Sequence, residues 1–133
     1  MVLLDTHALV WVVEGSPHLG RRVARLVDDA LGSDRLGVAS ISFWEVAMLA
    51  HRRRIALDPS VEDWRLRVLG LGVHEIPLTG DIAIAAVGLA ELHADPADRV
   101  IVATGLVTDA TLVTADDRIL RWPGTLVRRD ARR

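Results

Sequence analysis

The sequence contains no lysine and no cysteine over its 133 residues, and all sixteen of its basic residues are arginine. The absence of lysine excludes the P-loop, whose G-K-[ST] signature places a lysine against nucleotide phosphates. It also argues against receiver-like phospho-acceptor domains and haloacid-dehalogenase-like phosphatases, which ordinarily use a lysine beside an aspartate at a strand end. The absence of cysteine excludes disulfides and thiolate metal sites and agrees with a reducing cytoplasm.

Length and composition indicate one globular domain. Half of the residues are hydrophobic, which is enough to bury a substantial core, and the formal net charge is only −2. We expect a single domain over residues 1–127 and a mobile, basic C-terminal tail over residues 128–133. The apolar N-terminus has no basic leader and is interrupted by Asp5, His7 and Glu14. We therefore expect no signal peptide, no membrane span and a cytoplasmic location.

Short apolar runs alternate with helical patterns along the chain. The runs lie at residues 1–4, 36–41, 73–78, 111–114 and 125–127. This alternation predicts an α/β fold in which helices flank a central, mainly parallel sheet of four to five strands. Pro77 places the third run near an edge of the sheet. Helix N-caps are predicted at Ser42, Asp58-Pro59-Ser60, Asp81 and Asp95.

Acidic residues follow several of these runs. Asp5 comes directly after the first, Glu45 lies in the first turn after the second, and Asp116 follows the fourth. Asp98 stands near the start of a helix that Asp95 caps. Because each crossover returns the chain in the same direction, the carboxyl ends of the strands share one edge of the sheet, where ligands bind.

Carboxylates that converge with no lysine nearby would raise one another's pKa values unless a cation joined them. Hard oxygen ligands without cysteine select magnesium or manganese over zinc. Such a site is suited to clamping phosphodiester oxygens and activating a water for in-line attack.

Four segments of the chain resemble the PIN-domain ribonucleases, in particular the VapC toxins of type II toxin–antitoxin pairs. They are Leu3–Trp11, Ser42–Glu45, Asp95–Arg99 followed by Val102-Ala103, and Val113–Asp116. Each segment alone is a weak signal, but four in the family's order are highly specific. Together they span nearly the whole chain, from Leu3 to Asp116.

The resemblance implies a three-layer PIN-like fold and a metal-dependent endoribonuclease that leaves a 3′-hydroxyl and a 5′-phosphate. It assigns metal binding and catalysis to Asp5, Glu45, Asp98 and Asp116. Thr6 and Thr114 would line the site and contact the substrate. The implied cofactor is Mg²⁺, with Mn²⁺ as a substitute. The implied partners are RNA, a cognate VapB-type antitoxin that wraps around the toxin and blocks its site, and a second copy in a homodimer.

Each acidic candidate also has a structural explanation. Asp5 could only cap its helix, and Glu45 could only favour a helix N-terminus through the dipole. Asp98 in a first helical turn is favourable by roughly 0.3–1 kcal/mol without any catalytic role. Asp116 competes with Asp117 for the fourth position, and the spacing from Thr114 favours Asp116.

Other polar and aromatic residues are harder to assign. His7 and His93 have no partner at metal-ligand spacing and are interpreted as structural or merely near the site. Trp11, Trp44 and Trp64 lie on apolar faces, so we expect packing and not base stacking. The arginines considered for the phosphate backbone are Arg52, Arg53, Arg54, Arg99, Arg118 and Arg121. Most of them are expected to be solvated, and Arg99 is the one predicted to contact RNA.

The main alternative function is a catalytically inactive PIN-like module that binds RNA or a protein, but retention of all four carboxylates argues against it. A DNA-directed, structure-specific nuclease usually carries additional helical arches or domains. A small-molecule phosphohydrolase would require an Asp-x-Asp pair and a lysine, which are absent.

Overall fold

The computed structural model describes residues 1–57 and 60–133. It has the predicted α/β fold, with five parallel strands and flanking helices. The strands, in sheet order, are β3 (His74–Ile76), β2 (Leu36–Ala39), β1 (Val2–Leu4), β4 (Thr111–Thr114) and β5 (Arg128–Asp130). The helices are α1 (Thr6–Glu14), α2 (Arg21–Gly32), α3 (Ile41–His51), α4 (Val61–Gly70), α5 (Gly80–Val87), α6 (Pro96–Val107) and α7 (Asp117–Leu120). None of the described helices is long and apolar enough to cross a membrane.

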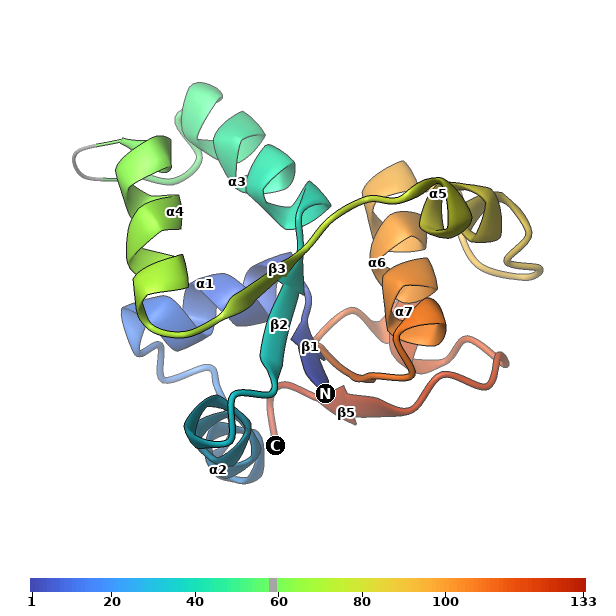
Figure 1. The fold of residues 1–133 in the computed structure, drawn as a ribbon, viewed down its shortest axis with the longest axis horizontal. Helices are drawn as coiled ribbons and strands as arrows, with labels where there is room; N and C mark the ends of the chain where they lie inside the picture. The colour runs from blue at the N-terminus through green and yellow to red at the C-terminus, as the bar shows by residue number, and fades with distance from the viewer. Residues whose placement is uncertain (58–59) are drawn as a thin grey trace.

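Alternation along the central strands produces the layers of the molecule. Leu4 and Val38 belong to one core, which α1 to α4 cover, whereas Leu3 and Leu112 belong to a second core against α5 and α6. Figure 1 shows the two groups of helices on opposite sides of the sheet. Because successive strand side chains point to opposite faces, a sheet covered on both sides needs apolar residues at every position. The short apolar runs of the sequence meet this need.

The carboxyl ends of β1, β2 and β4 lie at one edge of the sheet. Leu4 is in register with Val38 of β2 and with Val113 of β4. The Asp5 N–H then donates to the Val113 carbonyl at 3.0 Å, so the ladder fixes the backbone of Asp5. Strand pairing also makes β3 an outermost strand of the sheet, as Pro77 predicted.

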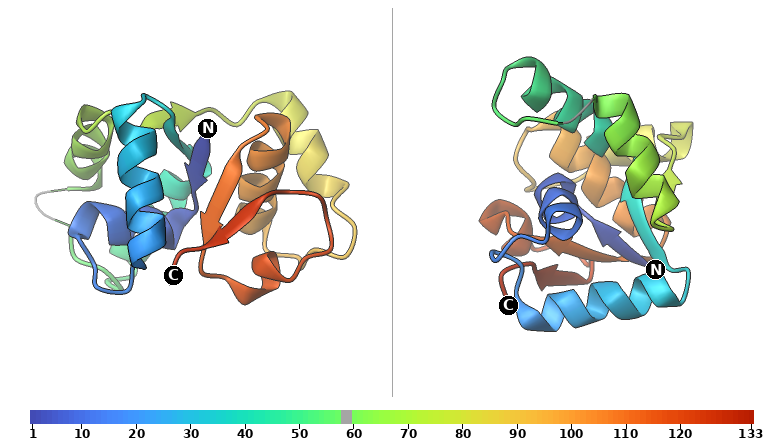
Figure 2. Two further views of the ribbon diagram at one scale, coloured as in Figure 1. Left: turned by 90° about the horizontal axis from the view of Figure 1, so that it is seen from below. Right: turned by 90° about the vertical axis from the view of Figure 1, so that its left-hand side faces the viewer.

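The last strand begins three residues later than predicted, and residues 128–133 are part of the fold. β5 occupies Arg128–Asp130, inside the segment expected to be a tail. Beyond it, the N–H groups of Gly20 and Val23 donate to the carbonyls of Ala131 and Arg133 at 2.8 and 3.0 Å. A Cβ on Gly20 would lie 2.0 Å from the backbone carbon of Arg133, so only glycine permits this approach. Figure 2 shows the C-terminus beside α2. The interpretation of this segment as a mobile tail is therefore wrong.

Two of the predicted helix caps are confirmed. The Asp95 carboxylate accepts from the Asp98 N–H at 3.0 Å, and the Ser60 hydroxyl accepts from the Asp63 N–H at 3.1 Å. The predicted contributions of Asp58 and Pro59 lie outside the described residues.

Two other predicted caps are wrong. Ser42 lies inside α3, whose N-cap position belongs to Ser40. Asp81 lies in the first turn of α5, where Thr79 is the cap and accepts from the Ile82 N–H. In both cases the helix begins earlier than the sequence pattern indicates.

Candidate metal centre

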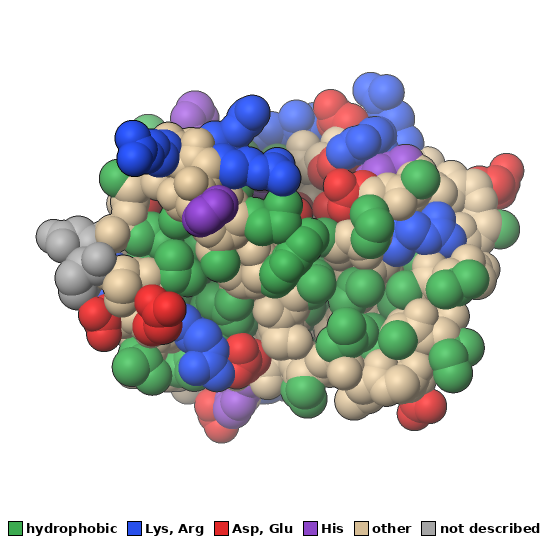
Figure 3. Space-filling model, turned by 90° about the horizontal axis from the view of Figure 1, so that it is seen from above, with side chains coloured by type: hydrophobic (Ala, Val, Ile, Leu, Met, Phe, Trp, Pro, Cys, Tyr) green, Lys and Arg blue, Asp and Glu red, His purple; other side chains and the backbone are tan. Residues whose placement is uncertain are grey.

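The four predicted carboxylates all line one cleft at the carboxyl edge of the sheet. Its volume is about 480 Å³. The polar side chains that line it include Asp5, Thr6, Glu45, Asp98, Asp116 and Arg118. Figure 3 shows acidic side chains on this side of the molecule, with arginine side chains on either side of them. The cleft therefore joins α1, α3, α6 and the β4–α7 connection, four segments that are distant in sequence.

Asp5 both caps a helix and faces the cleft. Its Oδ1 atom accepts from the Ala8 N–H at 2.8 Å, and only 6% of its surface is exposed. Burial raises the pKa of Asp5, while a hydrogen bond from the Thr114 hydroxyl opposes this shift. The structural explanation considered for Asp5 is thus correct, but it does not compete with a role in the cleft.

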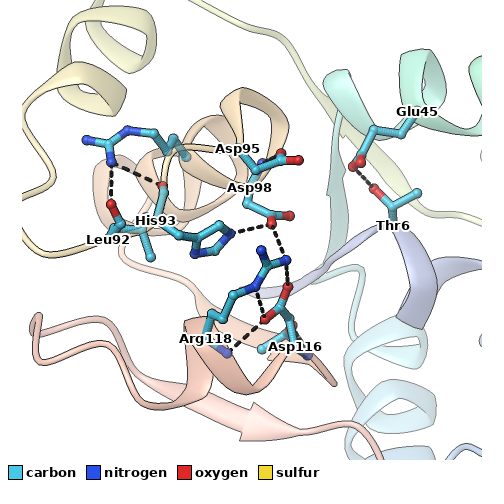
Figure 4. A network of polar contacts seen from close by, with 10 residues as sticks. Thr6, Glu45, Leu92, His93, Asp95, Asp98, Asp116 and Arg118 are labelled. Atoms are coloured by element: carbon cyan, nitrogen blue, oxygen red, sulfur yellow. Dashed lines mark hydrogen bonds and ion pairs between the residues drawn. The ribbon is translucent and has the colours of Figure 1, made fainter.

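Glu45 is held in place by Thr6, the first residue of α1. The Thr6 hydroxyl donates to Oε1 of Glu45 at 2.5 Å, and the same hydroxyl oxygen lies 3.0 Å from that of Ser42. Burial raises the pKa of Glu45, and the hydrogen bond from Thr6 opposes the shift. Figure 4 shows this pair on the side of the cleft opposite Asp98.

Asp98 has a partner that the sequence analysis missed, His93. The Nε2 atom of His93 lies 2.7 Å from Oδ2 of Asp98. Burial raises the pKa of Asp98, and the hydrogen bond with His93 opposes the shift. Ligand atoms of His93, Asp98 and Asp116 all lie within 4.8 Å of one another, which is close enough to hold one metal ion. Since His93 lies between α5 and α6, outside any helix, no helical spacing pointed to it.

Asp116 is engaged by Arg118 two residues later. Its Oδ2 lies 2.9 Å from Nη2 of Arg118, and its Oδ1 accepts both from Nε at 3.2 Å and from the Arg118 N–H at 2.8 Å. Arg118 thereby lowers the pKa of Asp116. Asp117 instead pairs with Arg132 at 2.9 Å and does not line this cleft. The spacing argument that favoured Asp116 over Asp117 is consistent with this geometry.

The donor set fits a hard divalent cation. It consists of four carboxylates, one of which is supported by the imidazole of His93, and magnesium and manganese bind such oxygen-rich sites. Asp5, Glu45 and Asp98 have raised pKa values, with burial as the main cause and neighbouring acidic groups adding to it. A cation bound among them would offset the free-energy cost of keeping these buried carboxylates charged.

Arg99 does not point its charge at the cleft. Its guanidinium group donates to five backbone carbonyls of the α5–α6 region, at distances between 2.8 and 3.3 Å. The acceptors are Ala86, Val87, Leu89, Leu92 and His93. This geometry corrects the prediction that Arg99 contacts RNA, because the donors of the guanidinium already have partners.

The tryptophans divide between the core and the surface. Trp64 is buried, with 1% of its surface exposed, as predicted. Trp11 is half-buried and lines the cleft. Trp44 is 54% exposed, so packing within the chain does not account for it.

Comparison with known proteins agrees with this fold. The family model described as PIN domain matches residues 2–124. Ribonuclease VapC22 of Mycobacterium tuberculosis is 37% identical over 119 residues, which are 89% of this chain and 88% of that protein.

Solved structures show the same architecture at lower identity. VapBC2 from Rickettsia felis, bound to a DNA fragment from its promoter, superposes with a TM-score of 0.72 at 16% identity, covering 97% of this chain and 98% of that chain. A toxin–antitoxin complex from Klebsiella pneumoniae gives a TM-score of 0.62 at 24% identity, covering 96% and 97%. The acidic cleft, the parallel sheet and these matches lead to one conclusion: the chain belongs to the PIN-domain family.

Proposed function

We propose that the protein is a metal-dependent endoribonuclease and the toxin of a type II toxin–antitoxin pair. The observation that carries the proposal is the convergence of Asp5, Glu45, Asp98 and Asp116 in one cleft of a PIN fold. The 37% identity to a protein named a ribonuclease supports RNA as the substrate.

The ion would be held by Asp98 and Asp116, with Asp5 and Glu45 completing the site and His93 supporting Asp98 through Nε2. We favour Mg²⁺, with Mn²⁺ as a substitute, because carboxylate oxygens dominate the donors. When bound, such an ion would neutralise charge on the phosphodiester and lower the pKa of a water.

The protein's own residues prepare the site for this chemistry. Thr6 fixes the carboxylate of Glu45, the helix cap fixes that of Asp5, and His93 fixes that of Asp98. Pre-positioned ligands lose little freedom when an ion binds. The Thr114 hydroxyl oxygen accepts from the N–H of Asp116 at 3.0 Å, and the same hydroxyl opposes the rise in the pKa of Asp5, so Thr114 acts on the site through its ligands.

We also propose a VapB-type antitoxin as the partner, a homodimer as the active form and a cytoplasmic location. The VapBC names of structural neighbours support the antitoxin. The homodimer rests on the resemblance to the family, and the exposed Trp44 provides apolar surface for such an interface.

The decisive experiment is incubation of purified protein with total cellular RNA in the presence of Mg²⁺, Mn²⁺ or a chelator. Asp5→Ala is compared with wild type, and Asp117→Ala serves as the control because Asp117 lies outside the cleft. We expect discrete, metal-dependent products from wild type and Asp117→Ala only. Folded, antitoxin-free wild type that cleaves nothing would instead favour the inactive RNA- or protein-binding module.

A further inference from the structure

Arg118 occupies the oxygens that the proposed site offers to its ion. Its guanidinium contacts both oxygens of Asp116, through Nη2 at 2.9 Å and Nε at 3.2 Å. The same Nη2 lies 3.7 Å from Oδ2 of Asp98. Figure 4 shows the guanidinium group between the two carboxylates. Arg118 thus supplies positive charge at the point where Asp98 and Asp116 meet.

A divalent ion and this arginine cannot occupy these oxygens together at low cost. Magnesium binds carboxylate oxygens at about 2.1 Å, so an ion on Asp116 would stand within about 5 Å of the guanidinium nitrogens. The two cations would repel one another there, and one of them has to leave. Because the ion would gain Asp98 as a ligand in addition to Asp116, Arg118 is the group that moves.

Little holds Arg118 apart from these two carboxylates. Its side chain is 63% exposed, and within residues 1–57 and 60–133 its guanidinium makes no other hydrogen bond or ion pair. Arg99 is the contrast, since backbone carbonyls fix its guanidinium from several directions. Displacing Arg118 would break only its contacts with Asp116 and Asp98, and the ion would bind these carboxylates in its place.

We propose that Arg118 is a phosphate-binding residue that the divalent ion releases: it pairs with Asp116 when no ion is bound and with an RNA phosphate once the ion is in place. The proposal rests on the proposed function and deepens it by assigning a substrate contact. The released side chain stays anchored on α7 at the rim of the cleft. The guanidinium fork that matches a carboxylate also matches two oxygens of a phosphate.

The first test measures ion binding without RNA. Titration of MnCl₂ into the metal-free protein is followed by calorimetry for wild type, Arg118→Gln, Arg118→Lys and Arg121→Gln. Arg121 lies three residues further on, and it is the charge control because it does not line the cleft. We expect Arg118→Gln to bind Mn²⁺ roughly twofold to fivefold more tightly than wild type, as removal of a half-exposed ion pair allows. Arg121→Gln should match wild type, and Arg118→Lys should fall between. Unchanged or weaker Mn²⁺ binding by a folded Arg118→Gln overturns the proposal.

The second test measures RNA binding with and without the ion. Fluorescence anisotropy follows a labelled, short single-stranded RNA, with Ca²⁺ as the ion or with chelator, and gels check that the RNA stays intact. When the ion is present, we expect Arg118→Gln to bind the RNA roughly threefold to tenfold more weakly than wild type does. With chelator, the difference between the two proteins should be clearly smaller. An equal loss in both conditions, or a loss that Arg121→Gln reproduces, means that only net charge matters and overturns the proposal.

The two tests separate this proposal from the proposed function. If wild type cleaves RNA but Arg118→Gln behaves like Arg121→Gln, the nuclease activity is supported and the proposed role of Arg118 is rejected. If wild type cleaves no RNA, the nuclease falls, and competition between Arg118 and Mn²⁺ is still decided by the first test.

Discussion

The Nε2 atom of His93 lies 2.7 Å from Oδ2 of Asp98, and this contact ties the α5–α6 connection to the acidic cleft. The Nδ1 atom of His93 is buried and has no hydrogen-bond partner within the part of the chain that the structure describes. The ring is therefore oriented by Asp98 and by packing alone. Asp98 in turn relies on His93 to keep one of its oxygens in position for a cation.

Replacing His93 by alanine should weaken divalent-ion binding by about tenfold, since hydrogen-bonding partners of metal ligands typically contribute at least that much. The measurement is calorimetric titration with Mn²⁺, followed by RNA cleavage rates. His93→Gln is the matched variant, because its amide nitrogen can take the place of Nε2 and should retain part of the affinity. Wild-type Mn²⁺ affinity in folded His93→Ala would show that His93 does not support the site.

His93 also shows where sequence reasoning about the site stopped. The sequence pointed to Asp5 and Asp116 because each follows a strand in a parallel sheet, and to Glu45 because it lies shortly after the second strand. These positions depend on chain order and strand direction, which the sequence carries. His93 precedes Asp98 by five residues in irregular backbone, so neither helical nor strand periodicity relates the two.

The sequence also did not predict the direction in which long side chains point. Arg99 follows Asp98 directly, and its guanidinium turns back onto the carbonyls of residues 86–93. Arg118 was only one of six candidates, yet it reaches Asp116. Alternating apolar runs predicted the sheet and its two covered faces, but β5 carries two arginines and an aspartate, a composition that gave no strand signal.

The pKa values of the cleft predict how stability depends on pH. Burial raises the folded-state pKa of Asp5 and Asp98 above 3.8 and that of Glu45 above 4.5. A raised pKa means that the folded protein binds protons more tightly than the unfolded chain does. The resulting stability is fully present below the unfolded values and is lost as pH rises through the raised values.

The metal-free protein should therefore gain thermal stability as pH falls from neutral towards the unfolded values of 3.8 and 4.5. At lower pH the opposite effect takes over, because the lowered pKa values of Asp116 and Asp130 mean that their contribution is lost below about 3.8. Circular dichroism melting in chelator over a pH series measures both limbs. Asp5→Asn should melt higher than wild type at neutral pH and show a smaller gain on acidification. A melting temperature that falls steadily from neutral pH to pH 5 would contradict the buried, charged cleft.

Thr6 should control the protonation of Glu45. Thr6→Val keeps the shape of a side chain that is only 4% exposed but removes the donor to Oε1. The pKa of Glu45 then rises further, because the hydrogen bond that opposed burial is lost. Protons compete more strongly with the ion, so Mn²⁺ binding should weaken roughly fivefold to tenfold near pH 6 and less at higher pH.

Thr6→Ser is the matched control for this prediction, because it keeps the hydroxyl and loses only a methyl group. Its Mn²⁺ affinity and the pH dependence of that affinity should stay close to wild type. If Thr6→Ser lost as much affinity as Thr6→Val, packing of the methyl group and not the hydrogen bond would be responsible.

Arg99 should matter for folding and not for RNA. Arg99→Ala leaves five carbonyl groups without their donor, and we expect it to lower the free energy of unfolding by about 2–4 kcal/mol. Arg99→Lys should recover little of this, because an ammonium group cannot reproduce the planar fork. Urea unfolding measures both, with Arg22→Ala on the exposed face of α2 as a control expected to change stability by less than about 0.5 kcal/mol. An Arg99→Ala protein as stable as Arg22→Ala but unable to bind RNA would reinstate the substrate contact that the sequence predicted.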